Sequence, residues 1–319
     1  MSLSGEPVRR GALAAEAKGG PAGSKPPAAD DGVAPAAMGA LQSGLYVTAT
    51  PIGNAGDLTL RARDILSRAA IVVAEDTRVT AKLFALHGIG TKLVSYRAEN
   101  AARATPAILA RLGRGEAVAL VTDAGTPHVS DPGAELVAAA VAAGHKVFAV
   151  PGASALTAAL SISGLAAKRT LFAGFLPPAE GARRAELAEL KSIDAALVFF
   201  EAPHRIEETL ADMAHVLGER QAVLCRELTK RHEEARRGTL GELAAAAAAD
   251  GDLRRGEIVL VVAPPAAADP QAAGEGLDAA LRRALATMRV KDAADAVAGA
   301  LGLPRRTVYA RALELKADA

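Results

Sequence analysis

The fold is decided by the stretch LYVTATPIGN at residues 45–54, in which an apolar run leads into a turn that contains Gly53. A second stretch of the same kind, AVALVTDAGTP, occupies residues 117–127 and is followed by SDPG at 130–133. Short apolar runs that end in glycine turns are typical of strands in an open α/β sheet, where ligands bind beyond the carboxyl ends of the strands. Glycine lets the backbone approach a ligand where a Cβ would collide. The two turns therefore predict two walls of one binding crevice.

Apolar runs and helical patterns alternate along the first half of the chain. This β-α-β-α order predicts a mostly parallel sheet that is covered by helices on both faces. We expect strands at 45–50, 71–74, 92–95, 117–122 and 146–150, and helices at 58–69, 78–87, 100–113 and 133–143.

A second α/β unit is predicted after Pro151-Gly152. Its first helix spans 154–163, with Ser154 as the expected N-cap. Periodicity does not determine the directions of the later strands. We expect those strands at 170–174, 195–200, 221–226 and 257–262, and helices at 181–191, 204–217 and 239–248.

The two ends of the chain differ in composition from its middle. Residues 1–42 are dominated by Ala, Gly and Pro without a hydrophobic period, so we expect a disordered N-terminal extension. The predicted domains are then 43–152 and 153–264, followed by a Pro- and Ala-rich linker at 265–276.

The tail, 277–319, is expected to form a small helical module. Its last two helical patterns are spaced as in a helix-turn-helix with Gly302 at the turn. Residues 277–316 hold eight lysines and arginines against four acidic residues, a local excess of four positive charges. Two interpretations are open: contact with nucleic acid, or packing against the body or a partner subunit.

Composition excludes several classes of protein. The net charge of +1 gives no bulk attraction to nucleic acid, so any basic surface must be local. A lone cysteine, Cys225, cannot form an intrachain disulfide, and no apolar run reaches the roughly 18 residues that a membrane helix needs. The chain carries no dinucleotide-binding, Walker A, zinc-ligand or hydrolase-elbow pattern. We therefore expect a soluble cytoplasmic enzyme without a metal site.

Six ordered blocks resemble one family, the bacterial ribosomal RNA small subunit methyltransferases I, within the tetrapyrrole-methylase-like superfamily. The resemblance covers about residues 44–263, and the tail is similar to the C-terminal helical module of that family. It implies two α/β domains with S-adenosylmethionine in the cleft between them, and a homodimer. It also implies 2′-O-methylation of a cytidine in the decoding centre of 16S rRNA, within the small ribosomal subunit. The blocks are ATPIGN (49–54), AEDTR (74–78), TDAGTPHVSDPG (122–133), VPGASALTAAL (150–160), EAPHR (201–205) and ELTK (227–230).

The resemblance also suggests which residues line the cofactor. The turns at 51–54 and 123–126 supply backbone groups, the first helix of the second domain supplies N-terminal amides, and two apolar side chains flank the adenine. An isolated glycine turn has a simpler interpretation, as a plain connection from strand to helix. The expected cofactor residues are Pro51, Gly53, Asp123, Ala124, Gly125, Val129, Ser154, Ala155, Phe200 and Leu228.

Methyl transfer to a ribose hydroxyl requires positioning and a nearby base or cation. The candidates for this role are Lys230, His204 and Asp76, and the candidates for RNA binding are Glu75, Arg78, Arg205, Arg305 and Arg306. Each has an alternative as a helix cap or a local ion pair. His204, for example, fits a capping role as well as that of a general base.

Two other functions remain open at this point. The first is methylation of a tetrapyrrole such as a corrin precursor, although a helix-turn-helix tail has no obvious use on a small macrocycle. The second is a non-catalytic ribosome-assembly factor that binds RNA without methyl transfer. The intact glycine turns favour an enzyme.

Overall fold

The computed structural model describes residues 41–127, 133–266, 270–301 and 303–317. Its first sheet has the order β3-β2-β4-β1-β5, and every pairing within it is parallel. The carboxyl ends of its strands therefore lie at one edge of the sheet, as the alternation of strands and helices predicts. The strands are β1 (Gly44–Thr48), β2 (Ile71–Ala74), β3 (Leu93–Ser95), β4 (Ala117–Val121) and β5 (Val147–Val150).

Helices pack on both faces of this sheet. α1 (Leu60–Arg68) and α2 (Thr77–His87) share an apolar cluster with one set of strand side chains. α3 (Ala101–Gly113) and α4 (Ala134–Ala142) share a second cluster with the alternate set. Because successive strand residues point to opposite faces, one sheet carries two cores, and its strands β2 and β4 are buried throughout.

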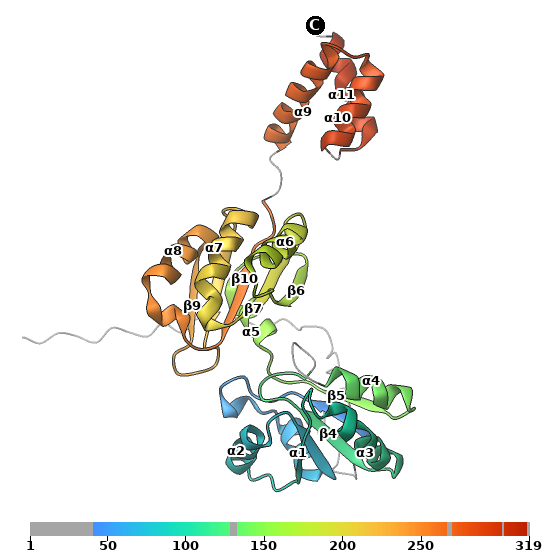
Figure 1. The fold of residues 1–319 in the computed structure, drawn as a ribbon, viewed down its shortest axis with the longest axis vertical. Coiled ribbons are helices and arrows are strands. Elements are labelled where there is room, and N and C mark those ends of the chain that lie inside the picture. Colours follow the sequence, from blue (N-terminus) through green and yellow to red (C-terminus); the bar gives the residue numbers. More distant parts are fainter. Residues whose placement is uncertain (1–40, 128–132, 267–269, 302, 318–319) are drawn as a thin grey trace, which may run out of the picture. The chain divides into compact units, whose positions relative to one another are not determined.

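The second sheet is mixed, with the order β6-β7-β10-β8-β9. β6 and β7 are parallel, whereas the other neighbours are antiparallel. Figure 1 shows α6, α7 and α8 beside this sheet, and they share its larger core. The elements are β6 (Thr170–Phe175), α6 (Glu180–Leu190), β7 (Ala196–Glu201), α7 (Ile206–Leu217), β8 (Gln221–Arg226), β9 (Glu234–Thr239), α8 (Leu240–Ala249) and β10 (Ile258–Val262).

The opposite face of the second sheet packs against α5 (Ala155–Ser163). Ala159 of α5 is fully buried with Val198, Val223 and Val261 of the sheet. Ile52, from the turn after β1, belongs to the same cluster. This packing brings the first turn of the chain to the second sheet.

Strand β9 was not among the predicted strands. Its sequence, EARRGT, carries three charged side chains, and it lies at the edge of the sheet with β8 as its neighbour. An edge strand is half solvated and is protected from further pairing by charge, so it lacks the apolar pattern of a central strand. The mixed charge of this segment is therefore the mark of an edge strand rather than of a loop.

The tail forms α9 (Pro270–Leu285), α10 (Val290–Leu301) and α11 (Arg305–Ala317), around a core of its own. Helix α9 starts inside the 265–276 segment predicted as a linker, because proline is well tolerated in the first turn of a helix. Of the predicted extension at 1–42, residues 1–40 lie outside the described residues. Within the described chain, no helix is long and apolar enough to cross a membrane. The predicted fold class, two α/β units and a helical tail, is confirmed.

Candidate functional site

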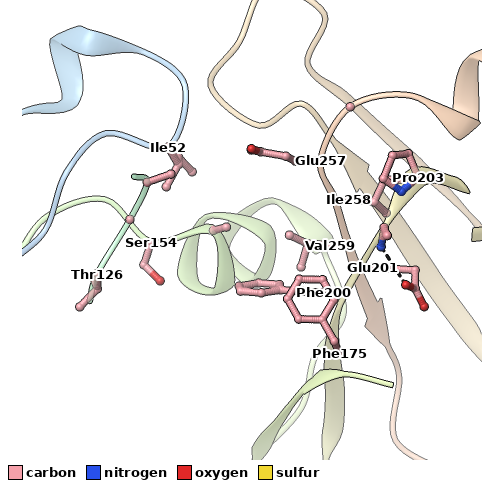
Figure 2. A pocket seen from close by; sticks show the side chains of 15 residues that line it. Ile52, Thr126, Ser154, Phe175, Phe200, Glu201, Pro203, Glu257, Ile258 and Val259 are labelled. Atoms are coloured by element: carbon pink, nitrogen blue, oxygen red, sulfur yellow. Dashed lines mark hydrogen bonds between the residues drawn. The ribbon is translucent and has the colours of Figure 1, made fainter. Parts of the chain in front are cut away.

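A cavity of about 370 Å³ lies where six segments meet. Figure 2 shows Ile52, Thr126 and Ser154 on one side, with Phe175, Phe200 and Val259 opposite them. The volume is in the range of small-molecule sites, which are mostly apolar with a few polar groups. Its lining is Ile52, Ala124, Gly125 and Thr126 from the first sheet, Ser154 and Ala155 of α5, Phe175, Phe200, Glu201, Ala202 and Pro203, and Gly256, Glu257, Ile258 and Val259.

Gly125 shapes the wall that comes from the first sheet. Its φ of 77° lies in the left-handed region, which glycine adopts without strain. The residue exchanges two backbone hydrogen bonds with Thr50, at 2.8 and 3.1 Å, so that the two glycine turns form one bridge. Ile52 Cγ2 lies 3.4 Å from the position a Cβ would take. Gly125 therefore leaves room in the cavity and joins the turns after β1 and β4.

The N-terminus of α5 forms the floor of the cavity. Ser154 is the N-cap residue as predicted, but its side chain makes no capping hydrogen bond. Thr126 Oγ1 instead donates to Ala153 O at 3.3 Å and ties the α5 entrance to the turn after β4. The first amides of a helix attract anionic groups such as a carboxylate. The Ser154 hydroxyl and these amides are thus arranged to hold a small polar ligand.

An aromatic wall lies on the side of the second sheet. The Phe200 ring packs against Phe172 at a centroid distance of 4.8 Å and against Phe175 at 5.7 Å, in edge-to-face geometry. Phe175 is 52% exposed, which is unusual for a large apolar side chain. This wall suits a flat heteroaromatic group such as adenine.

Glu201 and Arg205 hold the base of that wall. The buried Glu201 carboxylate accepts hydrogen bonds from Thr209 Oγ1 at 2.6 Å and from the Ala202 amide at 2.8 Å. Arg205 Nε lies 3.5 Å from Glu201, and its Nη2 donates to the carbonyls of Leu176 and Pro177. Arg205, predicted to bind substrate, thus has its guanidinium directed to the chain that follows Phe175.

The turn at 227–230 contacts the turn after β1. Glu227 and Thr229 have φ values of 52° and 65°, which are strained for non-glycine residues. Thr229 Oγ1 accepts a hydrogen bond from the Asn54 amide at 3.1 Å. A Cβ added at Gly53 would lie 2.4 Å from Lys230 Cγ, so Gly53 permits this close approach.

Lys230 is held between two carboxylates. Its Nζ donates to Glu227 Oε1 at 2.8 Å and to Glu257 Oε2 at 3.1 Å. Burial disfavours the charge, but the two hydrogen bonds outweigh it and raise the pKa of Lys230. The predicted catalytic lysine is therefore a permanent cation at neutral pH. Figure 2 shows its partner Glu257 reaching toward Ile52.

A second, polar cavity of about 500 Å³ lies beyond the carboxyl ends of β2 and β4. Asp76 caps α2 there and accepts hydrogen bonds from the Arg78 amide and guanidinium. Arg97 makes a further ion pair with it at 3.2 Å. The bonds from Arg78 are the main reason that the pKa of Asp76 lies well below its usual range. The lining is Glu75, Asp76, Arg78, Arg97, Ala98, Glu99 and Asp123.

The structure separates the predicted site residues into groups. The first cavity collects Ala124, Gly125, Ser154, Ala155 and Phe200, and the second collects Glu75, Asp76, Arg78 and Asp123.

The other predicted site residues lie elsewhere. Pro51 and Leu228 are buried outside both linings, and His204 is exposed in a short 3₁₀ helix, Pro203–Arg205. Arg305 and Arg306 belong to the tail. Val129 lies outside the described residues.

Sequence reasoning missed several lining residues, notably Phe175, Gly256 and Glu257. Phe175 comes directly after the predicted strand 170–174, and Glu257 is the first residue of the predicted strand 257–262. Their positions at the ends of predicted strands were thus the signal that could have identified them as lining residues. No group of three potential metal ligands was found among the described residues.

Comparison with known proteins gives two family matches. Residues 44–244 match the Tetrapyrrole (Corrin/Porphyrin) Methylases, and residues 270–316 match the RsmI C-terminal HTH domain. The "Ribosomal RNA small subunit methyltransferase I" of Neisseria meningitidis serogroup A is 45% identical over 85% of this chain and 94% of its own length. The protein of the same name from Mesorhizobium japonicum is 46% identical over 86% of this chain and 93% of its own.

Solved structures share the fold at low sequence identity. The methyltransferase CobJ has a TM-score of 0.53 at 18% identity and covers 70% of this chain and 95% of its own. Uroporphyrin-III C-methyltransferase from Thermus thermophilus, solved with S-adenosylhomocysteine, has a TM-score of 0.50 at 21% identity and covers 69% of this chain and 97% of its own. These likenesses support the architecture of the two sheets.

Proposed function

Since this chain belongs to the tetrapyrrole methylase family and to the ribosomal RNA small subunit methyltransferases I within it, we propose that it methylates 16S rRNA. The reaction is transfer of a methyl group from S-adenosylmethionine to the ribose 2′-oxygen of a cytidine in the decoding centre. The observation that carries the proposal is the 45% identity to a small subunit methyltransferase over 94% of that protein's length. The tail match at 270–316 supports an RNA substrate over a tetrapyrrole.

The residues of the first cavity fit S-adenosylmethionine. The amides at the start of α5 and the Ser154 hydroxyl suit its carboxylate, and the edges of Phe175 and Phe200 suit its adenine. Glu257 also lines the cavity, and its carboxylate is paired with the Lys230 ammonium. When bound, the cofactor supplies a methyl on a positively charged sulfur, ready for displacement.

The chain's own residues position the reactants and exclude water. The Thr50–Gly125 bridge and the Asn54–Thr229 bond hold three turns around the cavity. Arg205 fixes the carbonyls after Phe175, and so holds the aromatic wall in place. Such positioning contributes much of the acceleration in a displacement at carbon.

The tail is proposed to contact RNA. Arg305 pairs with Asp295, whereas Arg306 is exposed and makes no ion pair within the part of the chain that the structure describes. Phosphate contacts come from free cations, so Arg306 is the better candidate of the two. We further propose that the enzyme is a homodimer that acts in the cytoplasm.

The proposal is tested by tritium transfer from labelled S-adenosylmethionine to purified small subunits that lack the modification. We expect label in 16S rRNA at one ribose, located by primer extension under low deoxynucleotide concentration. Uroporphyrinogen III serves as the alternative acceptor. Label in the macrocycle, or RNA binding without any transfer, would overturn the proposal.

The same assay tests the role of the tail. Arg306→Ala should weaken subunit binding and lower the slope of log affinity against log salt by about 1, with cofactor affinity unchanged. Arg305→Ala is the matched control, because its guanidinium is already bound to Asp295. Equal loss in the two variants would assign the tail to packing.

A further inference from the structure

The two cavities share one turn. Asp123 lines the polar cavity, and the next two residues, Ala124 and Gly125, line the apolar one. Both residues follow β4, which ends at Val121. The two cavities therefore border the same turn. A transfer between their ligands requires the reacting atoms to meet at the edge of that turn, at about 3–3.5 Å.

We propose that the polar cavity receives the acceptor nucleotide and that Glu75 takes the proton from its 2′-hydroxyl. The inference rests on the proposed methyl transfer and adds the acceptor site and its base. In the step, the 2′-oxygen forms a bond to the methyl carbon while the carbon–sulfur bond breaks with its electron pair on sulfur. The hydroxyl proton passes to a carboxylate oxygen of Glu75 and is then released to water.

Other ionisable groups near the turn are already bound. Asp76 accepts bonds from the Arg78 amide and guanidinium, and Asp123 Oδ1 accepts the Asp76 amide at 2.9 Å. Lys230 is a cation between two carboxylates. A base must have a free lone pair and a pKa near the working range, so Asp76 and Lys230 are not suited.

The Glu75 carboxylate is held by a longer hydrogen bond than the Asp123 carboxylate. Within the described residues its carboxylate makes one hydrogen bond, a long one of 3.4 Å from the Asp123 amide to Oε2. Within the same described residues its other oxygen has no hydrogen-bond partner, so it can accept a hydroxyl proton. Partial burial is the largest cause of a raised pKa at Glu75, with the charges of Asp123 and Asp76 adding to it and Arg97 opposing it. A carboxylate with a raised pKa is a stronger base.

The rim of the polar cavity suits RNA. The side chains of Arg78 and Arg97 are 81% and 46% exposed, so both can reach a phosphate while their inner edges stay on Asp76. The carboxylates deeper in the lining repel phosphate but accept hydrogen bonds from hydroxyl and amino groups. This distribution of charge favours an RNA whose phosphates lie at the rim of the polar cavity and whose ribose and base lie inside it.

The test compares Glu75→Gln with Glu189→Gln, which removes a charge from an exposed residue of α6 outside both linings. For Glu75→Gln we expect a fall in kcat of about 10²- to 10⁴-fold, the usual contribution of a general base. Affinities for S-adenosylmethionine and for small subunits should change less than twofold. Glu189→Gln should keep kcat within about threefold, a change worth under 1 kcal/mol.

A second readout is independent of turnover. Carboxyl-carbon NMR of the full chain labelled in glutamate should show one titration above the ordinary glutamate range, absent in Glu75→Gln. The inference is overturned if Glu75→Gln keeps its kcat, if it loses ligand affinity in parallel with activity, or if no such titration exists. A wild-type enzyme that leaves ribosomal RNA unmethylated overturns the proposed function instead, so the two failures are distinguishable.

Discussion

The turn at 122–126 and the turn at 226–230 both border the site, but they are stabilised differently. In the first, the left-handed residue is Gly125, and the chain is unstrained there. In the second, Glu227 and Thr229 adopt left-handed φ values, which cost non-glycine residues roughly 1–2 kcal/mol each. Hydrogen bonds donated by Lys230 Nζ and by the backbone amides of Asn54 and Glu257 hold that second turn in place.

Left-handed backbone in these two turns therefore has two different causes. A glycine specifies its turn locally, so that turn is visible in the sequence and sensitive to any added side chain. The second turn is specified by contacts from other segments, so its residues are sensitive to loss of those partners. Substitutions at each turn should therefore fail in different ways.

The largest effect is expected for Gly125→Val. A β-branched side chain at φ 77° is strained, and its methyl groups would enter the cavity that Gly125 lines. Affinity for S-adenosylmethionine should fall at least about 100-fold, equivalent to about 2.7 kcal/mol, in isothermal titration calorimetry. Gly88→Val is the control, because Gly88 has φ 66° and open space around it. The two variants should lose similar stability, and unchanged cofactor affinity in Gly125→Val would contradict the assignment of this turn.

Gly256→Ala should disturb the second turn, because Gly256 lies against the side chain of Glu227. An added Cβ would lie 2.4 Å from Glu227 Oε1, which must then release Lys230 and the Glu257 amide. We expect the free energy of unfolding to fall by about 2 kcal/mol, from backbone strain and lost hydrogen bonds together. Gly144→Ala, at the same φ of 77° but in open space, measures the backbone part alone. If urea unfolding shows the same loss of unfolding free energy in both variants, the contact with Glu227 does not contribute to stability.

Lys230→Met tests the charge partners of the second turn. The side chain keeps its length but loses its ammonium group, so we expect about 1 kcal/mol lower stability at pH 7. Chiefly through its bond to Lys230, Glu227 has a lowered pKa, so its contribution is present above its ordinary pKa of 4.5 and is lost as pH falls through the folded value. Lys230 has a raised pKa, so its contribution is present below 10.5 and is lost at higher pH.

The measurement is therefore the stability difference between wild type and Lys230→Met at several pH values. The difference should be constant between about pH 5 and 10 and should shrink outside that window. Urea unfolding at pH 3.5, 7 and 11 is sufficient. A gap that stays equal at all three values would mean that the two ion pairs do not account for the difference in stability.

Thr229→Gly is expected to have the smallest effect. Glycine relieves the left-handed strain by about 1–2 kcal/mol, while the loss of the bond from the Asn54 amide and the greater freedom of the unfolded chain offset it. The net change in free energy of unfolding should stay below about 0.5 kcal/mol. A loss above about 2 kcal/mol would show that the turn carries little strain, and would remove the contrast with Gly125.

Local patterns predicted much of the fold. Residues 71–74 and 117–121 are apolar and buried on both faces, and the intervening helices leave parallel pairing as the natural arrangement. β9 was missed because its own side chains lack the apolar pattern of a strand. Its extended structure comes from pairing with β8. The directions of the strands in the second sheet were likewise decided by pairing.

At the candidate site, residue types were enough to predict two features of the backbone. Gly125 predicts a turn and Ser154 predicts the start of a helix. Both predictions follow from the residue type, because conformational freedom and capping act within a few bonds. Only the tertiary structure decided which charged groups are free. Asp76, Lys230 and Arg205 are bound by partners from their own and other segments, while Glu75 keeps an open oxygen. Ionic pairing depends on distances of a few ångströms between residues far apart in the chain, and no local pattern contains them.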